Sequence, residues 1–267
     1  MQQLKISFIG GGNMAEALIA GLRRAGHEAD HICVAEPGEE RRKQLAGQYG
    51  VRVTAENRAA VTDADMVVLA VKPQQMQVAL QGISDAIDAN ATVVSIAAGL
   101  TVAKLASMLG GQAHIVRVMP NTPALVGAGV SVLYSTADEQ HRHRAEYLMM
   151  ACGSAYWLDQ EQQMHAVTAL SGSGPAYFFL LTEVMEASGV ALGLSRELAR
   201  DLASQTALGA GRMLVESGRP ADALRQQVTS PGGTTQAALD MMFREGLPDT
   251  VRKALTVACR RSQELAS

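Results

Sequence analysis

A short run near the end of the chain combines hydroxyl and glycine residues at the start of a helical pattern. Residues 230–235 read SPGGTT, with no His, Lys or carboxylate among them. We expect Gly232 and Gly233 to expose backbone N–H groups at a helix N-terminus, where these groups and the helix dipole attract an anion. The threonine hydroxyls add further donors. The run therefore predicts a site that binds a carboxylate and donates hydrogen bonds, without a strong general base.

A glycine-rich turn near the start of the chain has the spacing of a dinucleotide-binding loop. Gly10, Gly12 and Ala15 form a G-x-G-x-x-A pattern directly after an apolar run and at the start of a helical pattern. The first glycine permits a tight turn, the second lets a pyrophosphate approach the backbone, and the alanine lets helix and strand pack closely. Glu36 ends the next apolar run, at the distance where an acidic residue binds the adenosine ribose. The pattern predicts a bound dinucleotide.

Three later apolar runs end in small or polar residues at positions suited to a cofactor. Ligands of open α/β sheets bind at the carboxyl ends of the strands. Prolines on either side of Asn121 and Thr122 predict a rigid loop with amide and hydroxyl donors facing this edge. The predicted cofactor-binding residues from the glycine turn and the strand ends are Ile9, Gly10, Gly11, Gly12, Asn13, Met14, Glu36, Ala70, Val71, Lys72, Pro73, Ala97, Ala98 and Asn121.

The elements around these residues change in character near Leu158. Before it, β-branched runs alternate with amphipathic stretches, which predicts a Rossmann-type, doubly wound α/β domain over residues 1–158. After it, residues 159–267 predict an all-helical domain, with Ser173 and Ser195 as helix caps. The expected strands are 4–9, 31–35, 66–71, 91–96, 114–119 and 130–134. The expected helices are 13–25, 39–49, 74–87, 102–109, 161–170, 174–192, 195–216, 221–228, 234–244 and 248–265.

Two of the expected helices are apolar around more than one face. Residues 176–192 and 198–214 carry Ala, Gly and Ser beside larger apolar residues. An ordinary surface helix has one apolar stripe. We therefore expect these helices to pack against a second copy of the chain, with a homodimer as the minimal active unit.

The composition excludes several classes of function. A formal net charge of −3 and 4% aromatic residues give no basis for binding nucleic acid or an anionic membrane. No apolar run approaches a membrane span, and the first residues lack the layout of a secretory signal. The three cysteines form no C-x-x-C pair and the six histidines no ligand spacing, so we expect a cytoplasmic protein without a disulfide or metal site. Residues 141–143 (HRH) are expected to form a solvated helix face.

The second half of the chain offers no clear general base, which narrows the chemistry. An enzyme that oxidises a C–OH group needs a base to take the hydroxyl proton. No lysine lies between Lys104 and Lys253, and His165 stands beside apolar residues and is expected to pack. A protonated cyclic imine needs no such base, because it already carries the positive charge that draws hydride. Two alternatives stay open: a hydroxy-acid dehydrogenase of the same architecture, and a dinucleotide-sensing protein without turnover.

Five motifs, in order along the chain, resemble those of the Δ1-pyrroline-5-carboxylate reductase family, the last enzymes of proline biosynthesis. They are GGGNMA, AVKP, VRVMPNTP, ALSGSGPAYFF and VTSPGGTT, and they cover essentially the whole chain. The resemblance implies a Rossmann domain followed by a helical dimerisation domain, with higher oligomers built from dimers. It also implies NAD(P)H-dependent reduction of 1-pyrroline-5-carboxylate to L-proline, with the substrate between the cofactor and the helical domain, near the dimer interface.

The resemblance implies residue roles position by position. Thr235 is similar to the family's proposed donor to the imine nitrogen, and Glu161 to an acidic residue near the substrate. Asn57 resembles a contact on the adenosine side of the cofactor. The loop for the substrate carboxylate is matched by Ser230, Gly232, Gly233 and Thr234.

The sequence departs from the family at the end of the second expected strand. Where some members have an Arg suited to the 2′-phosphate of NADPH, this chain has Glu36-Pro37-Gly38. A carboxylate there accepts hydrogen bonds from a ribose and repels a phosphate. Arg41 and Arg42 follow, but in a helix that starts near Gly38 they are expected to lie more than a turn away from the ribose. We therefore expect NADH to be used well beside NADPH.

Overall fold

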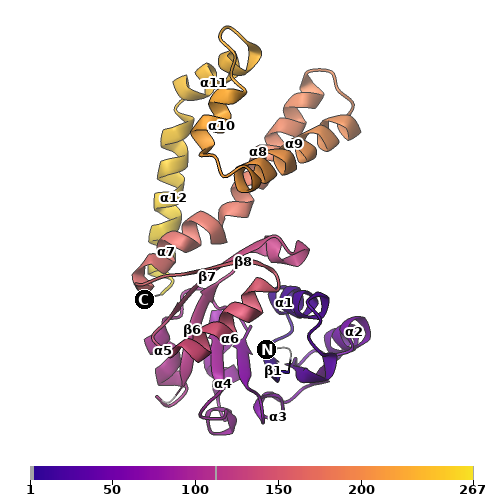
Figure 1. The fold of residues 1–267 in the computed structure, drawn as a ribbon, viewed down its shortest axis with the longest axis vertical. Coiled ribbons are helices and arrows are strands. Elements are labelled where there is room, and N and C mark those ends of the chain that lie inside the picture. Colours follow the sequence, from indigo (N-terminus) through magenta and orange to yellow (C-terminus); the bar gives the residue numbers. More distant parts are fainter. Residues whose placement is uncertain (1–2, 112, 267) are drawn as a thin grey trace. The chain divides into compact units, whose positions relative to one another are not determined.

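The computed structural model describes residues 3–111 and 113–266 and divides the chain into two compact units. The first unit comprises residues up to Gly172 together with the end of the chain from Ala258, and the second comprises residues 173–257. Among the described residues the strands all lie in the first unit, and the second is helical (Figure 1). The sheet ends near residue 158, whereas the compact units divide after Gly172. The predicted Rossmann-type sheet followed by a helical domain is confirmed.

An eight-stranded sheet in the order β3-β2-β1-β4-β5-β6-β7-β8 forms the centre of the first unit. The strands are β1 (Ile6–Ile9), β2 (Ile32–Ala35), β3 (Arg52–Thr54), β4 (Met66–Leu69), β5 (Thr92–Ser95), β6 (His114–Met119), β7 (Gly129–Ser135) and β8 (Gly153–Trp157). Neighbouring strands are parallel, except that β6 and β7 are antiparallel. The strand order reverses between β1 and β4, and a crevice at the carboxyl ends of such strands is where this kind of sheet binds ligands.

The central strands are buried on both faces, whereas the edge strands are not. All residues of β1, β2, β4 and β5 are buried, as β-branched apolar runs are in a parallel sheet. The edge strands β3 and β8 are partly exposed and mix polar with apolar residues. The sequence pattern predicts neither of them, because such short, mixed segments carry too little period-two alternation.

Helices lie between the strands of the first unit, and one more follows the last strand. They are α1 (Asn13–Arg24), α2 (Glu39–Tyr49), α3 (Asn57–Val61), α4 (Met76–Leu80), α5 (Val102–Met108), α6 (Glu139–Met150) and α7 (Met164–Val167). The single helix predicted over residues 74–87 is wrong, since Gly82 takes a left-handed φ of +74° and α4 ends before it. The helix predicted over residues 161–170 is also divided, into the 3-10 turn Glu161–Gln163, α7 and the π-helical turn Thr168–Gly172.

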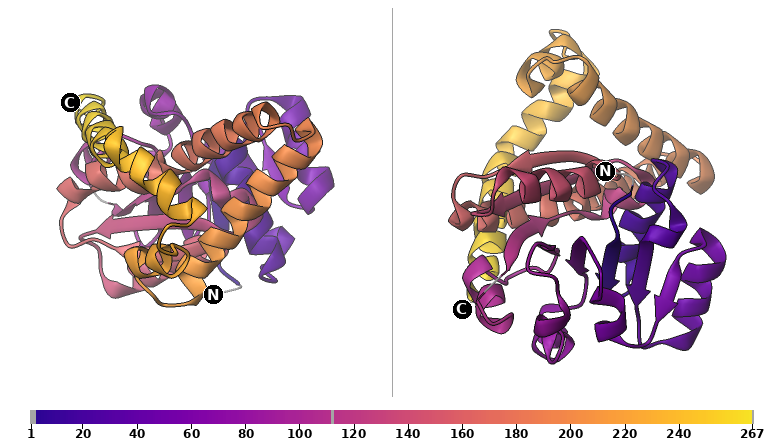
Figure 2. Two further views of the ribbon diagram at one scale, coloured as in Figure 1. Left: turned by 90° about the horizontal axis from the view of Figure 1, so that it is seen from above. Right: turned by 60° about the horizontal axis from the view of Figure 1, so that its bottom comes forward.

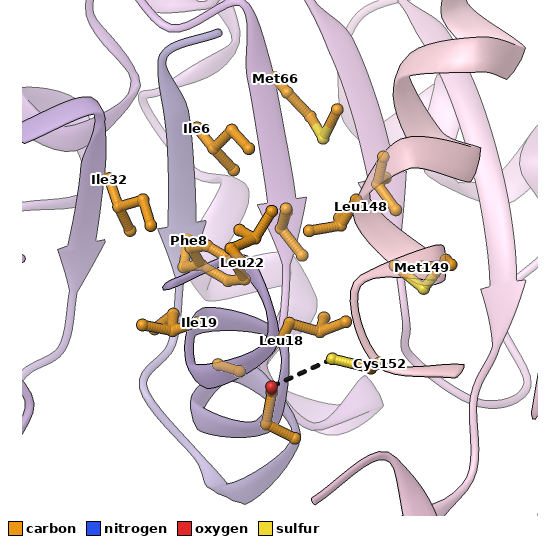
Figure 3. Close-up of a cluster of buried hydrophobic side chains, with 14 of the residues drawn as sticks. Ile6, Phe8, Leu18, Ile19, Leu22, Ile32, Met66, Leu148, Met149 and Cys152 are labelled. Atoms are coloured by element: carbon orange, nitrogen blue, oxygen red, sulfur yellow. Dashed lines mark hydrogen bonds between the residues drawn. The ribbon is translucent and has the colours of Figure 1, made fainter. Parts of the chain in front are cut away.

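Two apolar clusters fill the two faces of the sheet. Alternation along β1 sends Ile6 and Phe8 to one face and Ile9 to the other. Helices α1 and α6 cover the first face (Figure 3), and α3, α4 and α5 contribute to the second cluster. Cys152 belongs to the first cluster and donates a hydrogen bond to the carbonyl oxygen of Ala17 at 3.1 Å. Burial raises the pKa of the Cys152 thiol to about 11, so it is a core residue rather than a reactive thiol.

His141 on α6 is buried, so the prediction of a solvated face is wrong at this position. Its Nδ1 lies 2.7 Å from Oγ1 of Thr92, and its ring stacks on that of His114 with the centroids 3.7 Å apart. Burial, together with the neighbouring His114 and Arg144, lowers the pKa of His141 below its usual value. His143 on the same helix is exposed, as predicted.

The second unit is built from α8 (Gly174–Ala191), α9 (Arg196–Glu216), α10 (Ala221–Gln227), α11 (Thr234–Arg244) and the larger part of α12 (Leu247–Glu264). Helix α8 packs along α9, and both can be followed in Figure 2. Ser195 caps α9 as predicted, by accepting a hydrogen bond from the N–H of Leu198 at 3.2 Å. The predicted cap at Ser173 is wrong, because this residue has helical backbone angles (φ −85°, ψ −17°) and its side chain makes no capping hydrogen bond. In the described part of the chain no helix is both long and apolar enough to span a membrane.

Candidate active site

The glycine turn lies between β1 and α1, where the strand order reverses. Gly10 has a φ of +97°, and a Cβ there would lie 2.9 Å from Cγ1 of Val71 and 3.0 Å from the carbonyl oxygen of Ala70. A side chain at Gly10 is therefore excluded both by backbone conformation and by its neighbours. The N–H of Ala70 donates to the carbonyl oxygen of Ile9 at 2.9 Å. Gly10 thus lets the end of β1 lie directly against the end of β4.

Gly12 is the open position of the turn. A Cβ on Gly12 would meet no heavy atom within 4 Å, and α1 begins at Asn13 with no side chain capping it. Gly12 and Asn13 are exposed and Met14 is half-buried. A pyrophosphate requires just this combination of unpaired N–H donors and open space. The turn fits the phosphates of a dinucleotide.

Glu36 turns its carboxylate toward the glycine turn. Its Oε2 accepts a hydrogen bond from the N–H of Gly11 at 2.9 Å, and its Oε1 accepts one from the N–H of Gly38 at 2.9 Å. On the other side, a Cβ on Gly11 would lie 2.8 Å from Cδ1 of Leu45. Glu36 therefore stands beside the glycine turn, where an acidic residue of this fold contacts the ribose.

Arg41 reaches the glycine turn and Arg42 reaches the residues that follow β2, while their distance from a bound ribose stays a prediction. Arg41 donates from Nε to the carbonyl oxygen of Gly11 at 2.6 Å. Arg42 donates from Nη1 to the carbonyl oxygens of Glu36 and Pro37, each at 2.7 Å. The prediction located the arginines by their place along the helix. Helical side chains lean toward the N-terminus, and a long guanidinium side chain reaches back past the first turn.

The ends of β4 and β5 present small residues at the same edge of the sheet. Ala97 is buried and the N–H of this residue lies 3.4 Å from Oγ of Ser95, which shapes the turn after β5. Ala98 beside Ala97 is exposed at this edge. The predicted residues with exposed or half-exposed side chains there are Ala70, Val71, Lys72, Pro73 and Ala98.

Two predicted cofactor contacts, Asn57 and Asn121, use their amides inside the protein. Nδ2 of Asn57 donates to the carbonyl oxygen of Ala79 at 3.1 Å, which joins α3 to α4. Asn121 is buried, donates to the carbonyl oxygen of Ser171 at 3.1 Å and accepts from the N–H of Val130 at 2.9 Å. The amide of Asn121 braces its loop instead of facing the sheet edge as a donor. Cofactor contacts by these two residues stay predictions.

Glu161 forms an ion pair with a buried arginine. Its Oε1 accepts from Nη1 of Arg117 at 2.9 Å and from the N–H of Val102 at 2.8 Å, the first residue of α5. The Arg117 side chain is only 5% exposed, so this contact compensates a charge removed from water. Glu161 is thereby bound to β6 and α5, and a contact with substrate stays a prediction. His165 packs nearby, with Nδ1 3.0 Å from Oγ of Ser262.

The glycines of the second unit's hydroxyl run do not leave their N–H groups open, contrary to the prediction. The N–H of Gly232, which has a φ of +72°, donates to Oε1 of Gln236 at 2.8 Å. The N–H of Gly233 donates to the carbonyl oxygen of Ser230 at 3.0 Å. The N–H groups of a tight turn are used in the hydrogen bonds that close the turn. Helix α11 starts at Thr234 with no side chain capping it, so the open donors begin there.

Three hydroxyls stand around this helix N-terminus. In residues 3–111 and 113–266, none of the hydroxyls of Ser230, Thr234 and Thr235 takes part in a hydrogen bond that the structure shows. Ser230 and Thr234 are exposed and Thr235 is half-buried. The site is therefore a set of hydroxyl and backbone donors at the positive end of a helix, and it suits a small anion.

Known proteins match both halves of the chain. Residues 161–265 match the family model described as pyrroline-5-carboxylate reductase dimerisation, and residues 5–99 match one described as NADP oxidoreductase, coenzyme F420-dependent. A pyrroline-5-carboxylate reductase of Pseudomonas aeruginosa is 48% identical over 268 residues, covering 100% of this chain and 98% of that protein. The chain belongs to the pyrroline-5-carboxylate reductase family.

Solved structures of this family share the fold over the full length. A pyrroline-5-carboxylate reductase from Coxiella burnetii is 40% identical, with a TM-score of 0.94 and 99% of each chain covered. The pyrroline carboxylate reductase of Plasmodium falciparum with NADP bound is 31% identical, with a TM-score of 0.89 and 100% of each chain covered. Membership of the pyrroline-5-carboxylate reductase family disfavours both alternatives, the hydroxy-acid dehydrogenase and the sensor without turnover.

Four polar side chains help to shape these sites. Sequence reasoning sets two of them aside, Arg41 and Arg42, and misses the other two. An Arg within an apolar strand, as in VRVM, is a signal that a buried partner must exist. A Gln in the first turn of a helix is a signal for a bond back to the preceding turn. The four residues are Arg41, Arg42, Arg117 and Gln236.

Proposed function

We propose that the protein transfers hydride from NADPH to the carbon of the C=N bond of protonated 1-pyrroline-5-carboxylate, which leaves the neutral amine of L-proline. The observation that carries this function is the N-terminus of α11, where hydroxyls and N–H groups gather in a run without His or Lys. Such a site binds an anion and donates hydrogen bonds, but it has no group basic enough to take a proton from an alcohol. It suits an imine that carries a carboxylate.

The first unit supplies the residues that hold the dinucleotide. Gly12 and the first N–H groups of α1 bind its phosphates, Glu36 its adenosine ribose, and the small residues after β4 and β5 its nicotinamide side. When bound, the dinucleotide supplies the hydride. We include NADH as a second cofactor, because a carboxylate at Glu36 accepts hydrogen bonds from a ribose without a 2′-phosphate.

The second unit supplies the residues that hold the substrate. The N–H groups of Thr234 and Thr235 and the hydroxyl of Ser230 bind the carboxylate. Oγ1 of Thr235 donates a hydrogen bond to the ring nitrogen, which becomes more basic as the C=N bond accepts hydride. An oriented donor that meets developing electron density in this way is stronger in the transition state than in the ground state.

A homodimer is a further part of the proposal. Side chains of Phe178, Phe179 and Leu180 on α8 are 64%, 65% and 59% exposed in a single chain. Large apolar residues exposed in this number on one helix are typical of a surface that packs against another protein. The segment that matches the dimerisation model includes α8 and α9. Assembly of dimers into a larger particle is proposed on the family resemblance, and a cytoplasmic location on the three free cysteines.

A substrate panel tests the proposed reaction. Purified protein is mixed either with 1-pyrroline-5-carboxylate and NADPH or with a hydroxy acid and NADP+. The product of each mixture is identified by mass spectrometry. We expect proline from the imine and no oxidation of the hydroxy acid. Oxidation of a hydroxy acid with no proline formed would contradict the proposal. Light scattering at assay concentration tests the dimer, and an active monomer would overturn it.

A further inference from the structure

We propose that Arg42 binds the 2′-phosphate of NADPH and thereby sets the preference between NADPH and NADH, an inference that rests on the proposed dinucleotide site of the first unit. The sequence alone points the other way, since Glu36 at the end of β2 favours an unphosphorylated ribose. The side-chain contacts around Glu36 change this expectation. They show that hydrogen bonds occupy the guanidinium group of Arg41, whereas Arg42 keeps donors available for a ligand.

Arg41 has all three of its guanidinium nitrogens occupied. Nε donates to the carbonyl oxygen of Gly11 at 2.6 Å, Nη2 to the Glu16 carboxylate at 2.7 Å and Nη1 to Oε1 of Gln44 at 2.8 Å. Burial raises the pKa of Glu16, but hydrogen bonds from Arg41 and Tyr49 and the charge of Arg41 outweigh it and leave that pKa lowered. Glu16 is therefore a charged partner for Arg41 at neutral pH. Arg41 is a brace of the glycine turn.

Arg42 is held at the end of β2 but keeps donors to spare. Its Nη1 donates to the carbonyl oxygens of Glu36 and Pro37, which places the guanidinium group beside the residue expected at the ribose. Among the described residues its Nε and Nη2 form no hydrogen bond. A guanidinium group with two donors on one edge matches a phosphate. Arg42 is half-buried, so the group is partly shielded from water and yet accessible.

Glu36 opposes a phosphate less than its charge suggests. Both of its carboxylate oxygens already accept backbone hydrogen bonds, from Gly11 and from Gly38. These contacts hold the carboxylate against the glycine turn and partly offset its charge. Glu36 thus favours a ribose hydroxyl, whereas Arg42 favours a 2′-phosphate.

Lys43 provides a matched control. Its Nζ lies 2.8 Å from Oε1 of Glu39 and 3.5 Å from Oε1 of Glu40, so its charge is directed to exposed carboxylates of its own helix. Lys43→Met and Arg42→Met each remove one positive charge from neighbouring positions of α2. Only the second removes the charge that stands beside Glu36.

Calorimetric titration without any pyrroline substrate tests the proposal. NADP+ and NAD+ are titrated into wild type, Arg42→Met, Arg42→Lys and Lys43→Met, with adenosine 2′,5′-bisphosphate and 5′-AMP as probes of the adenosine end alone. We expect Arg42→Met to weaken NADP+ and the bisphosphate by ~10- to 100-fold and NAD+ and AMP by less than ~2-fold, as for one lost charge-assisted contact. Arg42→Lys is expected to lie between, because it keeps the charge without the fork. Lys43→Met is expected to leave the ratio of NADP+ to NAD+ affinity unchanged.

Two results would overturn the role of Arg42. Equal weakening of NADP+ and NAD+ by Arg42→Met would show that Arg42 only braces the end of β2. Unchanged affinity for both would show that another group holds the phosphate. Since the titration needs no turnover, failure of the protein to reduce the imine would refute the proposed reaction and leave this measurement unaffected.

Discussion

Two glycines of the same turn, Gly10 and Gly12, should separate folding from cofactor binding when each is replaced by alanine. At Gly10 the backbone has a φ of +97° and a methyl group would collide with Val71 and with the backbone of Ala70. At Gly12 the backbone has a φ of −68° and a ψ of −178°, which any residue adopts, and a methyl group would meet nothing within 4 Å. Gly10→Ala is therefore a folding variant and Gly12→Ala a binding variant.

The magnitudes follow from these environments. For Gly10→Ala, left-handed strain and the forced shift of β4 together cost about 2 to 4 kcal/mol of unfolding free energy. In a chain of this size that lowers the thermal midpoint by about 5 to 15 °C. For Gly12→Ala, reduced freedom of the unfolded chain offsets the poorer helix cap, so stability changes by no more than ~0.5 kcal/mol. The new methyl group fills the space of the pyrophosphate, and losing one or two of its contacts weakens NADP+ by roughly 10- to 100-fold.

Circular dichroism melts and NADP+ titrations on both variants provide the test. We expect Gly12→Ala to melt like wild type and to bind NADP+ weakly, and Gly10→Ala to melt early. A Gly12→Ala protein that binds NADP+ with wild-type affinity would refute the assignment of this turn to the phosphates. A Gly10→Ala protein with an unchanged midpoint would refute the strain argument.

Two further predictions concern a buried histidine and the loop before α11. His141 has a lowered pKa in the folded protein. Below about pH 6.5 the unfolded chain therefore binds a proton at this residue that the folded chain does not bind. The unfolding free energy then falls by up to ~1.4 kcal/mol per pH unit until the folded pKa is reached. Urea unfolding at pH 7.5 and 5.5 should show that the unfolding free energy of His141→Gln falls less between these two pH values than that of wild type. Equal decreases would contradict this role of His141. Gln236→Met removes the acceptor for the Gly232 N–H and should raise the KM for pyrroline-5-carboxylate by ~3- to 10-fold while kcat and NADP+ affinity hold. Gln263→Met on an exposed face of α12 is the control, and a wild-type KM in Gln236→Met would exclude a positioning role.

The backbone of the cofactor site could be predicted from the sequence, because spacing and backbone conformation are linked. Gly10 and Gly12 are needed for a turn and an open approach, and both requirements can be stated without knowing any distant neighbour. The start of α11 at Thr234 was predictable for the same reason, from two glycines before a helical pattern. Local conformation is what local sequence encodes.

Side-chain contacts between distant segments could not be predicted in this way. The bond from Arg41 to Gly11, across 30 residues, and the buried pair of Arg117 and Glu161, across 44 residues, each depend on which partner the fold brings near. The burial of His141 likewise depends on Thr92, on a strand far away in the sequence. A charged or polar residue in the sequence suggests exposure to solvent. This expectation fails where the fold buries the residue beside a hydrogen-bonding partner.

Steady-state kinetics of Thr235 variants test the proposed mechanism most directly. Thr235→Val removes the hydroxyl at constant shape, Thr235→Ser restores it, and Thr250→Val makes the same change on α12. With pyrroline-5-carboxylate and NADPH, we predict that Thr235→Val lowers kcat by ~10- to 1000-fold, as for one lost transition-state donor. NADP+ affinity should stay at the wild-type value, Thr235→Ser should recover most of the rate, and Thr250→Val should lose none. A Thr235→Val protein with wild-type kcat would contradict the assignment of the nitrogen donor to this hydroxyl.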